Sequence, residues 1–426
     1  MTTQLQLANR HIISDLMLQV AVIEQVEPEF IRDGIEKGYI VIVPGSRKDV
    51  TPTAVGTGML AKIYTNLGTS SNQISIEQEI LKAQQAQKKG ANVIIDQSTA
   101  GDIESIRKLI IYNVNVPVGS IPLYETFAHA SRTGKDKYQF SSNFFLEMVN
   151  KHIEQGITNL GFHVSLCKKL LSFIESTGRL EKITSRGCGL LADWIIKSGQ
   201  ENPYYEIYDD LLDLLAQNDL PITLVANRTG AIVDGYDAVS IYEYDILGEL
   251  VQRARNKGVG AIVNGLGHMP LGKIPESVKL CKEKTYAAPL GVLGPAVTDL
   301  AHGHDHINAA IGSAMALLSG ADYINSQTRY EHLGLPTAEA VLEGVIASKI
   351  ACKASDNSRY PDRAMISERQ MDESRIKMGS CVGKLNLCID PEGAVSAFKE
   401  VVKSYDGGCS ICGAMCTYQT IQDLSI

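Results

Sequence analysis

Three cysteines near the end of the chain carry the most specific chemistry in the sequence. Cys409, Cys412 and Cys416 form a C-x2-C-x3-C cluster within the glycine-rich stretch 406–416. Thiolates this close on flexible backbone can wrap one soft metal centre. On a [4Fe–4S] cluster, three cysteines leave one iron without a protein ligand, and that iron can chelate S-adenosylmethionine for radical chemistry. The same spacing also fits a structural zinc completed by a distant cysteine or histidine, or thiols that bind no metal.

Two glycine-flanked histidines suggest a second metal site, for zinc or ferrous iron. His268 ends the segment GLGH (265–268), and His306 ends the segment GHDH (303–306), where histidines recur at alternate positions. Neutral imidazoles suit both metals, and glycine lets the backbone approach closely. A lone histidine is more often a buried structural residue, so the structural alternative stays open.

Composition excludes several classes of protein. The chain has 426 residues, a net charge of -8 and scattered basic residues, and its pI is near 5.7. These values argue against a nucleic-acid-binding surface. No stretch of 18 uncharged apolar residues exists, and Asp15 interrupts any signal-peptide core, so we expect a cytoplasmic protein with no membrane span. There the 9 cysteines stay reduced, which favours metal binding over disulfides for the clustered ones.

The elements that must position these residues alternate between short β-branched runs and amphipathic helical segments. The expected strands cover residues 39–43, 62–65, 93–96, 118–122, 160–163, 183–185, 223–226, 261–264, 292–294 and 323–325. Such alternation predicts an α/β fold with a parallel sheet, and eight or more units favour closure into a (β/α)8 TIM-like barrel. A doubly wound sheet is the alternative, weakened by the absence of a GxGxxG or Walker A motif.

Polar residues follow many of these strands at their C-terminal ends, where a barrel gathers its chemistry. They are Asn66, Asp96, Tyr124, His163, Ser185, Asn227 and His268. We expect three regions: an N-terminal segment (1–60), the barrel (61–353), and a linker with a small iron–sulfur cluster domain (354–426), because the sequence turns polar and charged after residue 354.

With these segments side by side, the chain resembles the phosphomethylpyrimidine synthase family, the radical S-adenosylmethionine enzymes of thiamin biosynthesis. The resemblance runs nearly end to end. Besides the terminal cysteines it rests on KIYTNLGTS (62–70), DQST (96–99), IPLY (121–124), SRG (185–187), LGP (293–295), TD (298–299), DHI (305–307) and EHLGLP (331–336).

The resemblance implies a fold, a substrate and partners. The fold is a (β/α)8 barrel, and the C-terminal cluster domain covers the barrel of a partner chain in a homodimer. The electron donor is a protein such as flavodoxin or ferredoxin. The substrate is 5-aminoimidazole ribotide. Matching positions assign its contacts to Asn66, Tyr124, His163, Ser185, Arg186 and Gly187, the second metal to His268 and His306, and the cluster to Cys409, Cys412 and Cys416. Proton transfer falls to His163 or Tyr124.

Some pocket positions depart from the family pattern. The family's DGLRPG segment is VANRTG (225–230) here, with Asn227 and Arg228. Asn264 replaces a glutamate, Gly291 a substrate-contacting tyrosine, and Ile95 a methionine. We expect these positions to line the substrate site as well, with its charge changed by the two lost carboxylates.

These departures lead to the functional expectation. We expect a radical S-adenosylmethionine lyase or synthase of the 5-hydroxybenzimidazole synthase group, which rearranges 5-aminoimidazole ribotide for the lower ligand of cobamides, because function follows the site rather than the fold. The alternatives are phosphomethylpyrimidine synthase itself, a subunit that needs a homologous partner chain, and a zinc hydrolase.

Overall fold

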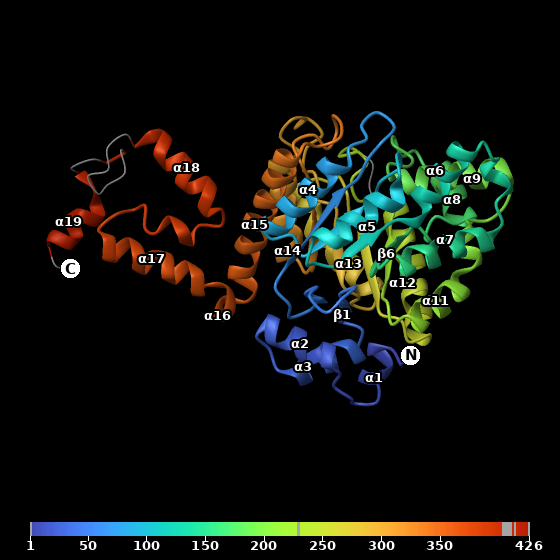
Figure 1. The fold of residues 1–426 in the computed structure, drawn as a ribbon, viewed down its shortest axis with the longest axis horizontal. Helices are drawn as coiled ribbons and strands as arrows, with labels where there is room; N and C mark the ends of the chain where they lie inside the picture. Colours follow the sequence, from blue (N-terminus) through green and yellow to red (C-terminus); the bar gives the residue numbers. More distant parts are fainter. Residues whose placement is uncertain (1, 228–230, 403–410, 413–414, 425–426) are drawn as a thin grey trace. The chain divides into compact units, whose positions relative to one another are not determined.

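Eight parallel strands form a closed barrel in the computed structural model, which describes residues 2–227, 231–402, 411–412 and 415–424. The strand order around the barrel is β10-β3-β4-β5-β6-β7-β8-β9. The strands are β3 (Lys62–Leu67), β4 (Val93–Asp96), β5 (Val118–Ser120), β6 (Asn159–Phe162), β7 (Ile222–Val225), β8 (Ala261–Gly265), β9 (Leu290–Val292) and β10 (Tyr323–Ser326). The predicted (β/α)8 TIM-like fold is confirmed (Figure 1).

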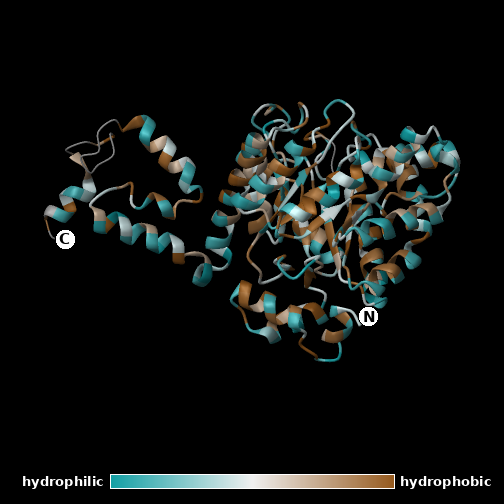
Figure 2. Ribbon diagram, viewed as in Figure 1, coloured by the Kyte–Doolittle hydropathy of each residue, from teal (hydrophilic) through white to brown (hydrophobic). Residues whose placement is uncertain are grey.

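Helices surround the barrel and bury one apolar face against it. They are α4 (Ile76–Lys89), α5 (Ile103–Asn113), α6 (Pro122–Thr133), α7 (Ser142–Glu154), α8 (Lys168–Ser176), α9 (Arg186–Ser198), α10 (Pro203–Glu206), α11 (Tyr208–Gln217), α12 (Ala238–Asn256), α13 (Ile274–Lys284), α14 (Asp305–Leu318) and α15 (Ala338–Arg359). Helix α4 shows how local sequence sets the ends: Ser75 Oγ accepts a hydrogen bond from the Gln78 N–H, and Gly90 ends the helix in the left-handed region. Figure 2 shows apolar strands inside this helical ring.

The N-terminal segment closes one end of the barrel. It contains α1 (Gln4–Ala8), α2 (Asp15–Glu24), α3 (Pro28–Glu36) and the antiparallel pair β1 (Ile40–Val43) and β2 (Thr53–Gly56). Val41, Val43 and Val55 of this pair share a buried cluster with side chains of barrel strands, including Tyr64 and Val93. The hairpin therefore fills the N-terminal end of the barrel, and a ligand site is left to the C-terminal ends of the strands.

The strand predictions need correction at several places, among them residues 292–294, because β9 is Leu290–Val292. Residues 183–185 form no strand, since Ser185 is the N-cap of α9. The run 118–122 ends as a strand at Ser120, and Pro122 begins α6, because proline suits the first turn of a helix and has no N–H for a sheet. Strand β2 was not predicted from the sequence, and its four residues are too few for a clear period-two pattern.

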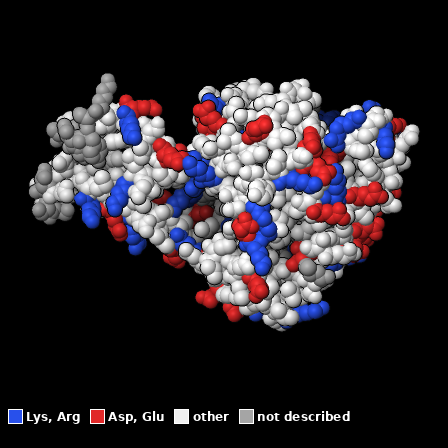
Figure 3. Space-filling model, in the orientation of Figure 1, with Lys and Arg blue, Asp and Glu red and all other residues white. Residues whose placement is uncertain are grey.

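The chain divides into two compact units, Met1–Ser355 and Asp356–Ile426. The second unit contains α16 (Pro361–Ala364), α17 (Ile366–Met378), α18 (Pro391–Val401) and α19 (Thr417–Asp423). Among the residues that the structure describes, no helix is both long and apolar enough to cross a membrane. On the face shown in Figure 3, acidic and basic side chains are interspersed.

Candidate active site

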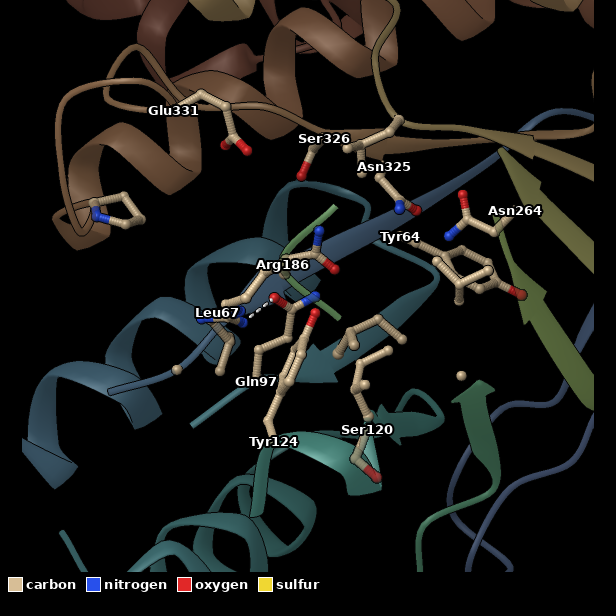
Figure 4. Close-up of a pocket in the computed structure, with 18 of the residues that line it drawn as sticks. Tyr64, Leu67, Gln97, Ser120, Tyr124, Arg186, Asn264, Asn325, Ser326 and Glu331 are labelled. Carbon is tan, nitrogen blue, oxygen red and sulfur yellow. Dashed lines mark hydrogen bonds between the residues drawn. The ribbon is translucent and has the colours of Figure 1, made fainter. Parts of the chain in front are cut away.

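A cavity of about 430 Å³ lies where the barrel strands end. It is lined by six of the predicted substrate-binding residues, which come from β3, β4, β8 and the loops or helices after β5 and β6. These six are Asn66, Ile95, Tyr124, His163, Arg186 and Asn264. Residues as far apart in the chain as Asn66 and Asn264 meet there because the carboxyl ends of all barrel strands face one mouth. Figure 4 shows several of them around this space.

Arg186 is the one cation among the described residues that line this cavity. Its Nη2 donates to Gln97 Oε1 at 2.8 Å, and its guanidinium lies 4.0 Å from the centroid of the Tyr124 ring (Figure 4). Arg186 is also the first residue of helix α9. The side chain of the N-cap residue, Ser185, makes no capping hydrogen bond to this helix. A fixed guanidinium beside the positive end of a helix is suited to bind a phosphate.

His163 and Gly187 pack directly against each other. A Cβ added to Gly187 would lie 2.2–2.5 Å from three ring atoms of His163. The His163 side chain is buried, and its ring centroid is 6.3 Å from that of Tyr124. Gly187 therefore serves the site by leaving space for the imidazole, since it is not among the residues that line the cavity.

Three further predicted substrate residues are not among the residues that line the cavity. Ser185 is buried at the start of α9. Asn227 is fully buried, and its N–H donates to the Glu243 carboxylate at 2.7 Å; burial raises the pKa of Glu243. Gly291 is covered by the ring of Tyr323. Arg228 lies outside the described residues.

A second cavity of about 540 Å³ adjoins the first. The two share Thr184, Leu293 and Glu331. His268, His302 and His332 all line the second cavity. The ring centroid of His332 lies 5.1 Å from that of His268 and 5.3 Å from that of His302. His306 is not among the lining residues.

His268 and His332 have the same carboxylate arrangement. His268 Nδ1 is 2.6 Å from Asp299 Oδ1, and His332 Nδ1 is 2.8 Å from Asp305 Oδ1. A carboxylate on Nδ1 holds the proton there and leaves Nε2 as the nitrogen that binds a metal. The pair thus fits a metal ion, although no group of three or more His, Cys, Asp or Glu residues in the described ranges forms a complete ligand set.

Two cysteines of the predicted cluster site are described. Cys412 is exposed and Cys416 is buried, and both are free thiols. The Met415 N–H donates to the Cys412 carbonyl at 3.0 Å, and Cys416 is the N-cap of α19. Cys409 lies outside the described residues. Unpaired thiols spaced four residues apart fit a thiolate-bound centre. Cys167, Cys188, Cys281 and Cys352 are buried, whereas Cys381 and Cys388 are half-buried.

A buried polar network supports the wall that carries Tyr124. Ser120 Oγ lies 2.7 Å from His152 Nδ1, and His152 Nε2 lies 3.0 Å from Glu125 Oε2. Arg107 donates to the same Glu125 oxygen at 2.6 Å and lies 3.4 Å from Asp96 Oδ2. In Figure 4 the Ser120 hydroxyl points away from the other labelled side chains. The network therefore supports the wall of the cavity, to which Ser120 itself contributes.

Electrostatics make this network sensitive to acid. Burial lowers the pKa of His152 to about 4, against the opposing effect of Glu125. Burial also opposes the ionisation of Glu125, but the hydrogen bond from His152 and the charge of Arg107 outweigh it and hold the pKa of Glu125 well below its usual range. At neutral pH, His152 is thus a neutral ring that donates from Nε2 to Glu125 and accepts from Ser120.

We expect His152 to reduce stability as the pH falls from about 6.5 to about 4. In that window His152 binds a proton in the unfolded chain but not in the folded chain. The free energy of unfolding is therefore higher above this pH range and falls as the pH drops through it. The loss is on the order of 3 kcal/mol. Besides Glu125, the charged groups around His152 are Arg107, Asp96 and Lys151.

Thermal unfolding of the His152→Gln variant between pH 4 and pH 7 measures this effect, because glutamine keeps a neutral hydrogen-bonding group that does not titrate. Its melting temperature is expected to fall less with acid than that of the wild type. His11→Asn is the control, since the His11 side chain is 71% exposed, and its profile should match the wild type. Parallel profiles for wild type and His152→Gln would contradict the assignment.

Several site residues were not predicted from the sequence. The structure adds His332, Asp299, Gln97, Glu331 and Asn325 to the two cavities. All except Asn325 stand in segments that the resemblance rests on, namely 96–99, 298–299 and 331–336. The family motifs therefore contained these residues. The spacing of the motifs along the sequence does not show that His268 and His332 lie side by side.

Comparison with known proteins gives one consistent family. Residues 3–423 match the model of the Radical SAM ThiC family. A phosphomethylpyrimidine synthase from Geobacter metallireducens is 39% identical over 425 residues, covering 99% of this chain and 97% of that protein. One from Pyrococcus furiosus is 38% identical over 424 residues, covering 99% and 98%. A solved dihydropteroate synthase from Coxiella burnetii, at 11% identity and TM-score 0.41 over 73% of this chain and 97% of its own, is too distant to carry an argument.

The expected 5-hydroxybenzimidazole synthase activity is wrong. Relatives that are 38–39% identical over 99% of this chain are named phosphomethylpyrimidine synthase, which was the alternative. One reason for the expectation was the missing tyrosine at Gly291. In the structure an aromatic ring does fill that space, and it comes from Tyr323. The lost side chain is therefore not evidence of a different reaction.

Proposed function

The chain belongs to the Radical SAM ThiC family, and from this membership we propose that it is a phosphomethylpyrimidine synthase of thiamin biosynthesis that acts on 5-aminoimidazole ribotide. As a family member it is a radical S-adenosylmethionine enzyme, which implies a [4Fe–4S] cluster and S-adenosylmethionine. When bound, these supply a carbon-centred radical that abstracts hydrogen.

One observation carries the substrate assignment. The cavity at the barrel mouth holds a single cation among its described lining residues, Arg186, and that cation is fixed by Gln97 and Tyr124. A phosphorylated nucleotide-like substrate needs one such anchor with neutral polar groups beyond it. Asn66, Asn264 and Asn325 provide those groups.

The residues of the cavity then have separate roles. Arg186 binds the phosphate, and the start of α9 at Ser185 adds backbone N–H donors. His163, packed on Gly187, and Tyr124, packed under Arg186, are the groups proposed to move protons, through a ring nitrogen and the phenol oxygen respectively. Asn66, Ile95 and Asn264 line the substrate space, while Ser185, Gly187, Asn227 and Gly291 shape it from behind.

We assign the second metal, zinc or ferrous iron, to His268 and His332 instead of His268 and His306. The geometry supports this pair, because both rings line one cavity and each has a carboxylate on Nδ1. A metal there would lie beside the substrate space, since the two cavities share Glu331 and two other residues.

Metal analysis tests the pair directly. After cluster reconstitution, so that the cysteines are occupied, His268→Ala and His332→Ala are each expected to lose at least ~10-fold in zinc affinity because one imidazole ligand is removed. His306→Ala is the matched histidine control and should bind zinc like the wild type. If His306→Ala lost zinc and His332→Ala retained it, the assignment to His332 would be wrong.

Two partners complete the proposal on the strength of the resemblance. A reduced flavodoxin or ferredoxin supplies the electron, and the chain acts as a homodimer. Light scattering of the full chain checks the dimer, and replacement of a chemical reductant by either protein checks the donor.

The test of the proposed function is anaerobic turnover by the full chain alone. Protein reconstituted with iron and sulfide is incubated with 5-aminoimidazole ribotide, S-adenosylmethionine and a reductant, and the products are identified by mass. A pyrimidine phosphate that depends on all three components supports the proposal. No pyrimidine phosphate from cluster-loaded protein, or a need for a second homologous chain, overturns it.

A further inference from the structure

Two stacked tyrosines fill one side of the barrel interior. The rings of Tyr64 on β3 and Tyr323 on β10 have centroids 4.1 Å apart and planes 28° apart, and both side chains are buried while lining the cavity. Tyr323 lies opposite Gly291 of β9 in the sheet register. A Cβ on Gly291 would lie 1.9 Å from Cζ of Tyr323. The Tyr323 ring thus occupies the space that a side chain at position 291 would need.

Two carboxamides lie beside this stack with buried oxygens that have no partner. Asn264 on β8 is 8% exposed and Asn325 on β10 is 3% exposed. Both line the cavity, and within the described ranges no hydrogen-bond donor reaches the Oδ1 atom of either residue. Figure 4 shows Asn264, Asn325 and Tyr64 grouped on one side, apart from Arg186 and Gln97.

A neighbouring amide shows that these two are exceptions. Asn159 also lines the cavity, and its Oδ1 accepts a hydrogen bond from Thr223 Oγ1 at 2.8 Å. Buried polar atoms are nearly always paired because desolvation without a partner is unfavourable. Two unpaired carboxamide oxygens that line a cavity therefore indicate N–H donors on a ligand.

The charge of the cavity defines that ligand further. Among the described lining residues, Arg186 is the one cation and Glu331 the one carboxylate. Neither belongs to the group formed by Asn264, Asn325 and Tyr64 (Figure 4). A cationic or anionic group would be buried there without a counter-charge, which is unfavourable. The end of the ligand that binds at the carboxamides is thus neutral and carries N–H donors.

We propose that Asn325 and Tyr323 of β10, together with Asn264, determine specificity for an uncharged, amino-substituted azole ring. The carboxamide oxygens accept hydrogen bonds from its exocyclic amino group, and the Tyr323 ring, which Gly291 admits, forms the wall against which the azole lies. This inference rests on the proposed function, because it assigns the ring of 5-aminoimidazole ribotide to this end and the phosphate to Arg186.

Calorimetric binding to the reconstituted full chain tests it with two ligands. One is 5-aminoimidazole ribotide, and the other is the ribotide in which hydrogen replaces the exocyclic amino group. The wild type is expected to bind the amino compound at least ~10-fold more tightly, because the analogue leaves the carboxamide oxygens unpaired. In Asn325→Leu, which keeps the size but removes the amide, that ratio should fall below ~3.

Matched variants separate specificity from general damage. Arg186→Gln is expected to weaken both ligands by the same factor and so keep the ratio, since the phosphate is common to them. If Asn325→Leu does not fold, Asn264→Leu tests the second carboxamide, which lies on a different strand. The ratio of the two affinities in the wild type is measured without any variant. Binding of both ribotides with equal affinity by the wild type would overturn this inference and leave the proposed function intact. Binding of neither would overturn the proposed function itself.

Discussion

Replacing Cys412 or Cys416 by serine is expected to lower turnover by at least ~1,000-fold. Three thiolates are the protein ligands of the implied [4Fe–4S] cluster, and a serine hydroxyl is a harder ligand that ionises only at much higher pH. Without the cluster no electron reaches S-adenosylmethionine, and the barrel cannot replace that chemistry.

The measurement pairs anaerobic turnover with the iron content and visible absorbance of the reconstituted protein. Cys388→Ser is the matched control, because Cys388 is a half-buried free thiol in the same unit, Asp356–Ile426, outside the C-x2-C-x3-C cluster. It should keep its iron and its activity within about 2-fold, since a substitution away from the ligands has a small effect. Full turnover by Cys412→Ser would show that these thiols do not hold the cluster.

Gly187→Ala is expected to lower kcat/KM by ~100-fold or more while the protein stays folded. The new Cβ would lie 2.2–2.5 Å from three atoms of the His163 ring, so the ring must move by about 1 Å to restore van der Waals contact. A displacement of that size in a catalytic constellation costs about two orders of magnitude in rate. His163 lines the cavity and is a proposed proton-transfer residue.

Gly189→Ala is the control on the same helix. A Cβ added at Gly189 meets nothing within 4 Å, so the substitution should leave kcat/KM unchanged. It should also stabilise the fold by about 0.5–1 kcal/mol, because alanine has the better helix propensity. Steady-state kinetics and thermal unfolding of both variants give the comparison. Equal kcat/KM for Gly187→Ala and the wild type would remove His163 from its proposed role.

Local sequence was sufficient for most of the elements of the barrel. Strand β4 (Val93–Asp96) has the predicted ends, and helix α4 (Ile76–Lys89) begins after its capping serine and ends before a glycine. These signals act through neighbours in the chain. The prediction failed at residues 183–185, where one isoleucine followed by Thr184 and Ser185 precedes α9. Two or three residues carry no periodicity that separates a strand from a helix N-cap.

The convergence of polar side chains at one mouth also followed from the sequence. Once parallel strands are expected to close into a barrel, residues after their carboxyl ends must meet, and Asn66, Tyr124 and His163 do line one cavity. Which residues turn inward is harder to predict. Ser185 and Asn227 lie behind the wall, since a single residue of offset moves a side chain to the other face of a strand or loop.

The sequence alone determined the alternation that builds a closed barrel and the order of three cysteines able to hold a cluster, because both depend on residues close together in the chain. Tertiary structure alone decided that His332, rather than His306, lies beside His268, and that Tyr323 covers Gly291. Each of those pairs joins different strands or loops, and their contact depends on strand register and barrel closure, which no local pattern contains.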